Sequence, residues 1–479
     1  MKKISFIFLV TIFIVVPVQA SWIKNYGDSN SQFGQVVEIT PDGGYFIIGN
    51  TYSEETEFDI LLIKTDENGD TMWTKTYGGL LNDFAYSGQI TTDGGFIIAG
   101  YTESSGAGEF DAWLLMTDPD GDTTWTQTYG DTGFDIAQGI YQTTDGGFVV
   151  TGYRDGILNQ EYDYPMPGDI WLFKVLETGT LEWEKTYGSP DEDFEEGHDV
   201  RQTSDGGYIV CCDGLKDAMT LSTAKLLKTD TAGDTVWVYR TQAYRSFNCI
   251  RETPDGSFMI AGNFDIGDLG LAKFDLNGSL LWEKTYGLPT PENDWANWIE
   301  EISDDNYIVT GTFDAIFTPQ ARDGDIWLLK VDENGDTLWT RKFGEKPQYD
   351  NGNCVRQTSD GGFIVTGLSE TYSNGGYDIC LIKTDSLGYV AVEENPISYH
   401  DNGLELITPI GREITLRYAD RSQGFHAEVF DASGRKVDEI RSVTTNGTFT
   451  WGVDFVPGVY FIREISGTSL PAKKVILVK

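Results

Sequence analysis

Few side chains in this 479-residue sequence are of the types that catalysis usually requires. Only three histidines occur, His198, His400 and His426, so neither a Ser-His-Asp triad nor a histidine-rich transition-metal site can be assembled. We interpret His198 as a satisfied strand histidine rather than a general base. Asp and Glu number 75, but no particular pair stands out as the acid and base that glycoside hydrolysis needs. We therefore assign no catalytic residue.

Five cysteines lie in apolar, strand-like runs without metal-type spacing: Cys211, Cys212, Cys249, Cys354 and Cys380. We expect buried, small apolar side chains rather than a disulfide framework. The adjacent pair Cys211-Cys212 leaves a redox role as an alternative, although two apolar substitutions on one strand explain it more simply.

Three acidic turns, at residues 66–70, 118–122 and 332–336, resemble the beginning of a calcium-binding loop. They lack the full spacing of that loop and its distal bidentate glutamate. A hairpin with a left-handed glycine accounts for them without a metal. We assign no metal site and expect no cofactor, with Ca²⁺ left open as an alternative.

The elements that must position any site belong to a repeat. A turn of the type Asp-Gly-Gly, or a degraded form of it, recurs about every 53 residues, beginning at Asp42, Asp93, Asp145, Asp205, Asp255, Asp304 and Asp360. Each unit has a strand before this turn, two strands after it, and a fourth that carries tryptophan and ends in Tyr-Gly. Such a period with four strands per unit predicts a β-propeller of seven blades. The recurring tryptophans should pack between neighbouring blades: Trp73, Trp125, Trp183, Trp237, Trp282 and Trp339.

The ends of the repeat predict how the ring closes. Residues 22–27 match the fourth-strand pattern, yet no first three strands precede them. The last unit instead has Val392 where tryptophan is expected. We predict that the N-terminal strand completes the seventh blade beside residues 378–383, which removes free sheet edges. The fold class is thus all-β, with a seven-bladed propeller over residues 21–392.

Ligand binding is expected where the repeat is interrupted, because variable loops on a repeated scaffold commonly carry function. The longest insert, residues 153–168, contains Arg154, Tyr162 and Tyr164, and the next, residues 312–324, contains Phe317 and Arg322. Trp295 lies off the pattern in a segment between two blades. Aromatic and polar side chains of this kind suit recognition of a glycan or peptide. The alternative is that the long loops pack on their neighbours.

The two ends of the chain differ from the repeats. Residues 1–20 are predicted to be a signal peptide, with Lys2 and Lys3, an apolar stretch and a Val18-Gln19-Ala20 cleavage site. No later run is long enough to span a bilayer. Residues 393–397 are predicted to be a linker, and residues 398–479 a small, immunoglobulin-like β-sandwich, because short alternating segments and turns fill them.

The net charge of −41 restricts the partners. Residues 21–395 hold 65 acidic and 22 basic side chains, whereas the charge of the tail is balanced. A surface of this kind repels nucleic acid and anionic lipid, so neither is expected as a partner. Solubility in an extracellular or saline setting explains the charge.

The tail resembles the type A C-terminal sorting domain of the Por, or type IX, secretion system. The resemblance covers residues 396–479 and depends on three motifs in order, at residues 429–437, 457–462 and 473–479. It implies export across the inner membrane, recognition by the outer-membrane translocon, and then surface attachment or release. The alternative is an ordinary sandwich that binds carbohydrate or packs on the propeller.

The repeats are similar to propellers of the quinoprotein-like superfamily, through the Asp-x-x-Gly-(Lys/Asp)-x-x-Trp pattern seen at residues 66–73 and 332–339. This resemblance implies the fold and does not imply a particular chemistry. We expect a secreted or cell-surface protein that binds a glycan, a peptide or another surface protein without catalysis. The alternative is a propeller enzyme, either a carbohydrate-active hydrolase or lyase or a quinone-dependent dehydrogenase.

Overall fold

The computed structural model divides the chain into two compact units, Met1–Ala391 and Val392–Lys479. It describes residues 21–159, 164–188, 194–215, 222–264, 267–287, 293–318, 321–373 and 375–390 of the first unit. In the second unit it describes residues 404–408, 410–411, 413–418, 425–431, 435–445, 447–453, 455–465 and 473–477. The predicted signal peptide and linker lie outside these residues. The described residues form strands and turns, as the sequence predicts, and none of them belongs to a helix that could cross a membrane.

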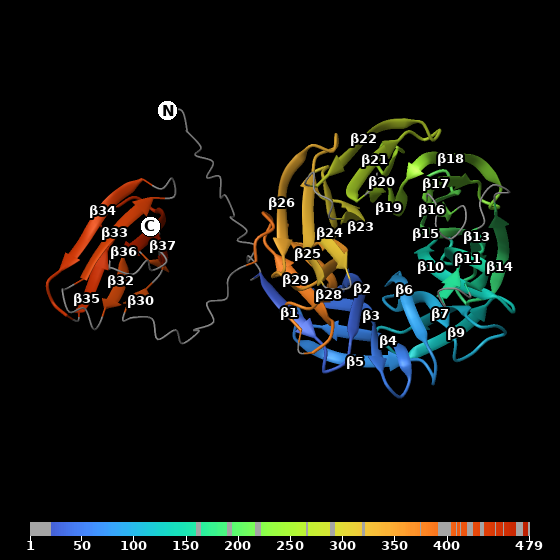
Figure 1. The fold of residues 1–479 in the computed structure, drawn as a ribbon, viewed down its shortest axis with the longest axis horizontal. Coiled ribbons are helices and arrows are strands. Elements are labelled where there is room, and N and C mark those ends of the chain that lie inside the picture. The colour runs from blue at the N-terminus through green and yellow to red at the C-terminus, as the bar shows by residue number, and fades with distance from the viewer. Residues whose placement is uncertain are drawn as a thin grey trace, which may run out of the picture. The chain divides into compact units, whose positions relative to one another are not determined.

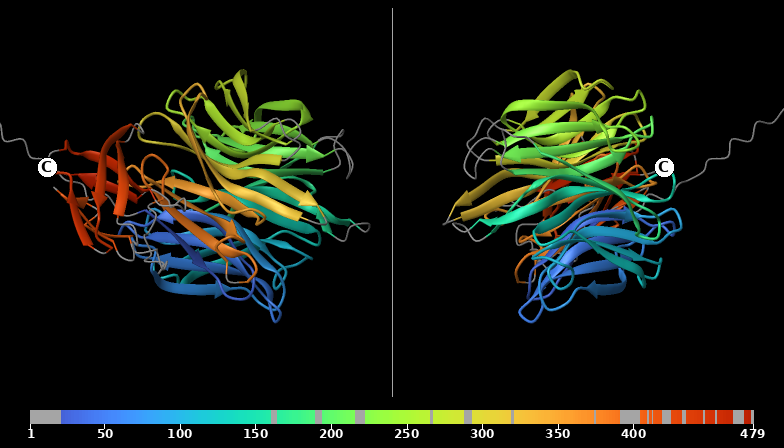
Figure 2. Two further views of the ribbon diagram at one scale, coloured as in Figure 1. Left: turned by 60° about the vertical axis from the view of Figure 1, so that its left-hand side comes forward. Right: turned by 90° about the vertical axis from the view of Figure 1, so that its right-hand side faces the viewer.

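The first unit is a β-propeller, in which antiparallel sheets follow one another around a ring (Figure 1). Its described residues form seven such sheets, and the turned views show these twisted sheets packed face to face (Figure 2). The first strand of each sheet faces the centre of the ring (Figure 1); these are β2 (Gln32–Ile39), β6 (Asp83–Ile90), β10 (Phe134–Gln142), β15 (Phe194–Gln202), β19 (Ser246–Glu252), β23 (Asn293–Glu301) and β27 (Asp350–Gln357).

The second and third strands of each sheet form its buried middle, since their apolar runs are covered on both faces. The second strands are β3 (Tyr45–Ser53), β7 (Phe96–Thr102), β11 (Phe148–Asn159), β16 (Tyr208–Leu215), β20 (Phe258–Phe264), β24 (Tyr307–Thr318) and β28 (Phe363–Ser369). The third strands are β4 (Glu57–Thr65), β8 (Asp111–Thr117), β13 (Asp169–Val175), β17 (Ser222–Thr229), β21 (Asp268–Phe274), β25 (Ala321–Val331) and β29 (Asp378–Thr384).

The outer strands carry the recurring tryptophans; they are β1 (Trp22–Tyr26), β5 (Thr71–Tyr77), β9 (Thr123–Tyr129), β14 (Leu181–Tyr187), β18 (Thr235–Tyr244), β22 (Leu280–Tyr286) and β26 (Thr337–Phe343). One of them comes from the other end of the unit. Strand β1 pairs antiparallel with β29, with Trp22 opposite Lys383 and Tyr26 opposite Ile379. The N-terminal strand therefore lies in the same sheet as β27, β28 and β29.

The tryptophans pack between neighbouring sheets, which confirms the prediction from the repeat. Each ring lies against the left-handed glycine in the next sheet's turn between its third and fourth strands. A Cβ atom placed on Gly121 would lie 2.7 Å from the ring of Trp73, and one on Gly388 would lie 2.8 Å from that of Trp339. In five of the outer strands, the Tyr four residues after the tryptophan donates its hydroxyl to the same glycine's carbonyl, as Tyr26 does to Gly69 at 2.7 Å. Trp22 packs on Gly69 in the same way, so β1 makes the contact that every other outer strand makes.

The Asp-Gly-Gly turns join the first and second strands and gain a contact that the sequence pattern does not reveal. In the first repeat, Thr40 N donates to Gly44 O at 3.0 Å and Gly43 has a φ of 85°. The buried Lys64 of β4 donates to Asp42 Oδ2 at 2.9 Å. Equivalent lysines pair with five more of these aspartates, whereas Met116 occupies this position in the second repeat.

The second unit contains two sheets with one apolar core, which includes Leu416, Val429 and Ile462. The smaller sheet has the order β30 (Leu404–Thr408), β32 (Ile414–Tyr418) and β35 (Gly447–Trp451). The larger has the order β31 (Ile410–Gly411), β37 (Lys473–Leu477), β36 (Gly458–Glu464), β33 (Phe425–Asp431) and β34 (Lys436–Ser442).

Candidate functional site

The centre of the ring is lined by residues that a repeated backbone irregularity turns inward. Every first strand has a β-bulge at the same register, so that in β2 Gly34 pairs with Gly49 whereas Val36 pairs with Ile48. The inserted residue is left without a partner in the ladder. We call these seven residues the bulge tier: Gln35, Tyr86, Gln138, His198, Asn248, Asn297 and Asn353. All seven line one cavity of about 180 Å³.

Carboxamides dominate the bulge tier and are held in place by the neighbouring sheet. Asn353 Nδ2 donates to Gly34 O at 2.8 Å, and Asn248 Nδ2 donates to Ala296 O at the same distance. Asn297 Nδ2 donates to Gly352 O at 3.0 Å. These bonds orient the amides at the sheet boundaries. The cavity is thus walled by fixed polar groups that can both donate and accept hydrogen bonds.

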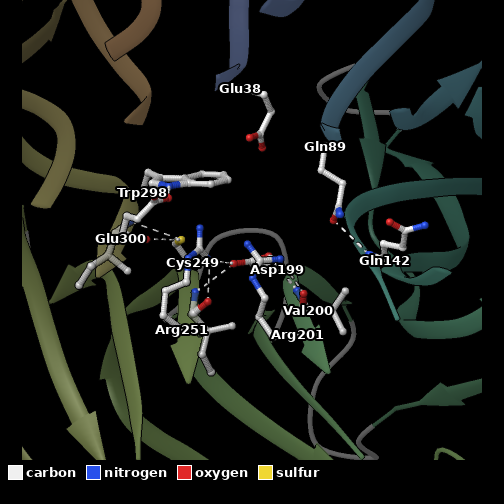
Figure 3. Close-up of polar contacts among 12 residues, drawn as sticks. Glu38, Gln89, Gln142, Asp199, Val200, Arg201, Cys249, Arg251, Trp298 and Glu300 are labelled. Atoms are coloured by element: carbon white, nitrogen blue, oxygen red, sulfur yellow. Dashed lines mark hydrogen bonds and ion pairs between the residues drawn. The ribbon is translucent and has the colours of Figure 1, made fainter. Parts of the chain in front are cut away.

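A second ring of inward-facing residues lies three positions further along each first strand. We call it the belt: Glu38, Gln89, Tyr141, Arg201, Arg251, Glu300 and Arg356. Its members line a larger cavity of about 400 Å³, which shares Ser87 and Trp298 with the cavity of the bulge tier. Figure 3 shows Glu38, Gln89, Arg201 and Trp298 around this common space, each from a different part of the chain.

The charges of the belt are largely compensated by ion pairs, some within the belt and some with the neighbouring Asp199. Arg356 contacts Glu38 Oε1 at 2.6 Å and Glu300 Oε2 at 2.5 Å. Although burial opposes its charge, these two carboxylates raise the pKa of Arg356 well above its usual value. Arg201 and Arg251 each contact one oxygen of the buried Asp199 at 2.8 Å.

Trp298 connects these two ion-pair groups. The Arg251 guanidinium carbon lies 4.5 Å from its ring centroid, and that of Arg356 lies 4.4 Å from it. Arg201 also lies over Tyr141, at 5.1 Å. Ion pairs and cation–π contacts therefore connect six of the seven sheets across their inner edges. We interpret the belt as a device that fixes the first strands, because little of its positive charge is left to attract an anion.

His198 faces carboxylates that favour its charged form, an arrangement that does not suit a general base. Its Nε2 lies 3.2 Å from Asp213 Oδ2 and 4.0 Å from Glu196 Oε1. Burial by itself would lower the pKa of His198, but these carboxylates, Asp213 above all, raise it to about 9. The interpretation as a satisfied strand histidine agrees with this arrangement.

Carboxyl groups near the beginning of the first strands have raised pKa values, among them those of Asp294, Asp135 and Asp350. Burial, with Asp314 and Asp268 nearby, raises the pKa of Asp294 to about 6, and its Oδ1 accepts a hydrogen bond from Asp314 N at 2.6 Å. Asp83, Asp135 and Asp350 occupy the same register of their own first strands. A position that recurs in this way belongs to the scaffold, so we do not assign Asp294 to catalysis.

The acidic turns that resemble calcium loops fold as hairpins. Asp66 Oδ1 accepts backbone hydrogen bonds from Asn68 and Asp70 at 2.9 and 2.8 Å, and Gly69 has a φ of 76°. The last Asp of each turn contacts a lysine of the preceding sheet, as Lys284 does Asp336 at 2.6 Å. Within the described ranges, no group of three or more His, Cys, Asp or Glu side chains is placed to hold a metal ion.

The cysteines are small buried side chains, as expected. All five are free and fully enclosed. Cys211 and Cys212 face opposite sides of β16, and burial raises the pKa of both thiols. The pair therefore shows no sign of a reactive thiolate.

Of the six predicted ligand residues, Arg154, Trp295 and Arg322 line neither cavity. Arg154 contacts Asp131 at 3.1 Å and Glu184 at 2.7 Å and lies over Trp171, which matches the alternative that this insert packs on its neighbours. Tyr162 lies outside the described residues, and Tyr164 pairs with Asn159 in the short strand β12 (Tyr164–Met166).

The remaining three lie on or beside extended strands. Phe317 of β24 pairs with Arg322 of β25, and Arg322 Nη1 donates to Tyr377 Oη at 2.8 Å. Trp295 is half-buried within β23, opposite Thr312. The sequence interpretation of both inserts as loops was wrong. The first lengthens β11, which pairs with the short strand β12, and the second lengthens β24 and β25 into a hairpin. Trp295 likewise belongs to a first strand and not to a connection.

The sequence interpretation did not include the residues that line the two cavities, although they stand at fixed positions in every repeat. Each bulge-tier residue stands seven positions before the Asp of its turn, and each belt residue stands four before it. The signal is a fixed spacing at which residue type varies from repeat to repeat. These residues occupy regular positions of the repeat, so the inserts that interrupt the repeat do not point to them.

Comparison with known proteins shows only remote structural likeness. No protein-family model and no curated protein matches the chain. A solved protein of unknown function from Bacteroides caccae is 11% identical, with 66% of this chain and 94% of that chain covered and a TM-score of 0.38. PorZ, a surface component of the type IX secretion system of Porphyromonas gingivalis, is 11% identical, with 91% and 69% covered and a TM-score of 0.35. The Pan2 WD40 domain of Neurospora crassa is 10% identical, with 74% and 91% covered and a TM-score of 0.42. Values this low carry no argument about function.

Proposed function

We propose that the protein is an exported, non-catalytic binding propeller that acts at or beyond the cell surface. Its ligand, a glycan, a peptide or part of a surface protein, enters the cavity of the bulge tier. The observation that carries this proposal is the tier itself, in which one inward residue per sheet varies in type on an otherwise constant scaffold. Polar groups held rigidly around a cavity are typical of binding sites.

The scaffold we propose is a seven-bladed propeller closed by its N-terminal strand. The pairing of β1 with β29 and the contact of Trp22 with Gly69 support it. Strand β1 covers the edge of β29 as an outer strand does in every other sheet, so no sheet of the ring is left incomplete and open to pairing with another chain.

We further propose that residues 398–479 form an immunoglobulin-like sandwich that directs the chain to the type IX translocon. The three sequence motifs of the resemblance map onto β33, β36 and β37, which are neighbours in one sheet. Together they would present one continuous surface for recognition.

The export proposal is tested in a bacterium that has this secretion system. Deletion of residues 396–479 should leave the protein in the periplasm, and fusion of these residues to a periplasmic reporter should bring the reporter to the surface. Continued surface display of the truncated protein would contradict the assignment.

The binding proposal is tested with the full chain on arrays of neutral glycans, acidic glycans and peptides, with and without Ca²⁺. Gln35→Ala combined with Gln138→Ala should lower the affinity for any ligand found by about tenfold, because two or more hydrogen bonds are lost. Gln127→Ala, an exposed glutamine on an outer strand, is the matched control. Equal binding by all three proteins would contradict a site at the bulge tier, and chemical conversion of a bound ligand would favour the enzyme alternative.

A further inference from the structure

Beside the bulge tier, six aromatic side chains contact one another in an unbroken series. We call this series the aromatic arc: Phe33, Phe58, Phe84, Tyr86, Tyr101 and Phe110. The ring centroids of successive members lie between 4.4 and 6.1 Å apart, with Phe33 and Phe58 at 5.8 Å and Tyr101 and Phe110 at 4.4 Å. Such contacts hold each ring in one orientation.

The arc lies on one face of the ring. Phe33 and Phe84 are near the beginning of first strands, Tyr101 is near the end of β7, and Phe58 and Phe110 are at the beginning of third strands. These strand ends meet at the same edge of antiparallel sheets, as the pairing of Phe84 with Tyr101 shows. None of the six rings is fully buried, and Tyr86 is 37% exposed.

The arc is not part of the repeated scaffold. At the register of Phe33 and Phe84, the other five first strands carry Ile136, Glu196, Ser246, Trp295 and Asn351. Repeated units use corresponding positions for the same packing. The arc is concentrated in two neighbouring sheets and extends from them to Tyr377 beside β29, 5.6 Å from Phe33, and to Phe134 of β10, 4.9 Å from Phe110. The rings therefore form a local aromatic surface rather than a contact that every sheet repeats.

The chemistry of the arc and its surroundings indicates one kind of ligand. Partly exposed rings that their neighbours hold in place offer flat apolar surfaces on which the C–H faces of sugar rings can stack, and Tyr hydroxyls can bond to sugar hydroxyls. Tyr86 belongs both to the arc and to the bulge tier, so the aromatic surface leads directly to the carboxamides. That cavity, at about 180 Å³, is smaller than the roughly 300 Å³ at which pockets for drug-sized ligands begin. A narrow chain end fits it better than a folded protein surface.

The charge of the propeller selects among glycans. Its excess of acidic side chains repels glycans with carboxylate or sulfate groups. We infer that the aromatic arc binds a neutral glycan chain lengthwise, with the end of the chain in the cavity of the bulge tier. This inference rests on the proposed function and names its ligand class.

The test measures binding of the full chain to cellohexaose, mannohexaose and maltohexaose by calorimetry, with the corresponding disaccharides for comparison. At least one hexasaccharide should bind, and more tightly than its disaccharide, because only the longer chain spans the arc. Phe84→Leu and Tyr101→Leu keep apolar volume but remove a ring, and each should weaken binding by about tenfold. Tyr389→Leu, which removes an exposed aromatic ring outside the arc, should leave binding unchanged.

Three outcomes would overturn the inference: no binding of any neutral hexasaccharide, binding confined to oligogalacturonate or to peptides, or equal binding by the Leu variants and the parent. Thermal unfolding of each variant checks that it is folded. If the arc variants bind normally while Gln35→Ala with Gln138→Ala does not, the arc inference fails and the proposed site at the bulge tier stands. If neither set changes binding, both fail.

Discussion

At the scale of single residues, the propeller depends on a contact between a tryptophan and a glycine that is made at every boundary between sheets. The glycine is required for two separate reasons, its left-handed φ and the ring that covers it. Gly121 has a φ of 79° and lies under Trp73, whereas Gly256 has the same φ and open space within 4 Å of the position that a Cβ atom would occupy. The two glycines therefore separate backbone strain from packing.

We expect Gly256→Ala to lower the free energy of unfolding by about 1–2 kcal/mol, the cost of a left-handed non-glycine residue. Gly121→Ala should cost about 1–3 kcal/mol more, because its methyl group would displace the indole. Thermal and denaturant-induced unfolding of the two variants measures the difference. Equal destabilisation by the two substitutions would show that the Trp73 ring can move aside at little cost. The contact between Trp73 and Gly121 would then contribute little to the stability of the protein.

The paired aspartate of the first hairpin makes stability depend on pH. Partial burial opposes its charge, but hydrogen bonds from Thr40, Lys64 and Gly44 lower the pKa of Asp42 to about 2. A carboxyl group whose pKa is lower in the folded protein stabilises it above the unfolded value, which is about 3.9, and this contribution is lost as the pH falls towards 2. We expect the free energy of unfolding to fall steeply as the pH is lowered over that range.

Asp42→Asn should remove part of this pH dependence and should also destabilise the protein at pH 7, because Lys64 is then buried without its partner. Asp93→Asn is the matched control, since Met116 stands where the other repeats have lysine. Melting temperatures of the three proteins between pH 7 and pH 2 check the prediction. Parallel profiles for the two variants would contradict it.

At the scale of elements, the N-terminal strand and the bulges determine what the ring can do. Strand β1 supplies the outer strand of a sheet whose other three strands begin more than 320 residues later in the chain. The bulge in each first strand turns one additional side chain towards the centre, so that two adjacent rings of polar residues face the cavities. Neither effect can be attributed to one residue.

Removal of residues 21–27 should expose β29 and uncover Gly69, and so lower the melting temperature and promote aggregation. A synthetic peptide of residues 21–31 added in trans should restore the melting temperature, with a dependence on peptide concentration that follows binding to the folded state. The same peptide with Trp22→Ala should rescue poorly, because the buried indole is lost. A truncated protein as stable as the parent would refute closure by this strand.

At the scale of the whole molecule, the net charge of −41 works against compactness through self-repulsion. The ion pairs of the belt and of the hairpins compensate only a small part of it. Salt screens such repulsion at the distances that separate surface charges.

We expect the melting temperature to rise with NaCl and to rise equally with CaCl₂ at matched ionic strength. Scanning calorimetry in the two salts measures this. A rise at Ca²⁺ concentrations too low to change ionic strength would contradict simple screening and would reveal a specific calcium site. Choline chloride is the control, because its large cation screens charge without binding to carboxylate clusters.

The sequence by itself determined the repeat, the strands and the turns, because glycine at a left-handed position and alternating apolar residues are local requirements. It also indicated the partner of each tryptophan, since one ring per unit must be covered by the next unit. The tail motifs and the match of residues 22–27 to an outer strand could be read in the same way. The features of the propeller are visible because they recur, whereas the tail motifs are visible because three of them occur in a known order.

Only the tertiary structure brought together the residues of the proposed ligand site. Residues such as Gln138, Asn297 and Asn353 are unremarkable along the chain, and they face a common cavity only because seven bulges place them at the same radius. The two inserts that the sequence indicated as binding loops are extended strands, because their residues continue to pair with a neighbouring strand. The role that we infer for Phe84 depends on its contacts with Tyr101 and Phe58, and the local sequence does not reveal that these residues lie beside it. Local propensities specify the four-stranded units of this fold, whereas the cavities at its centre form only when the units are arranged in a ring.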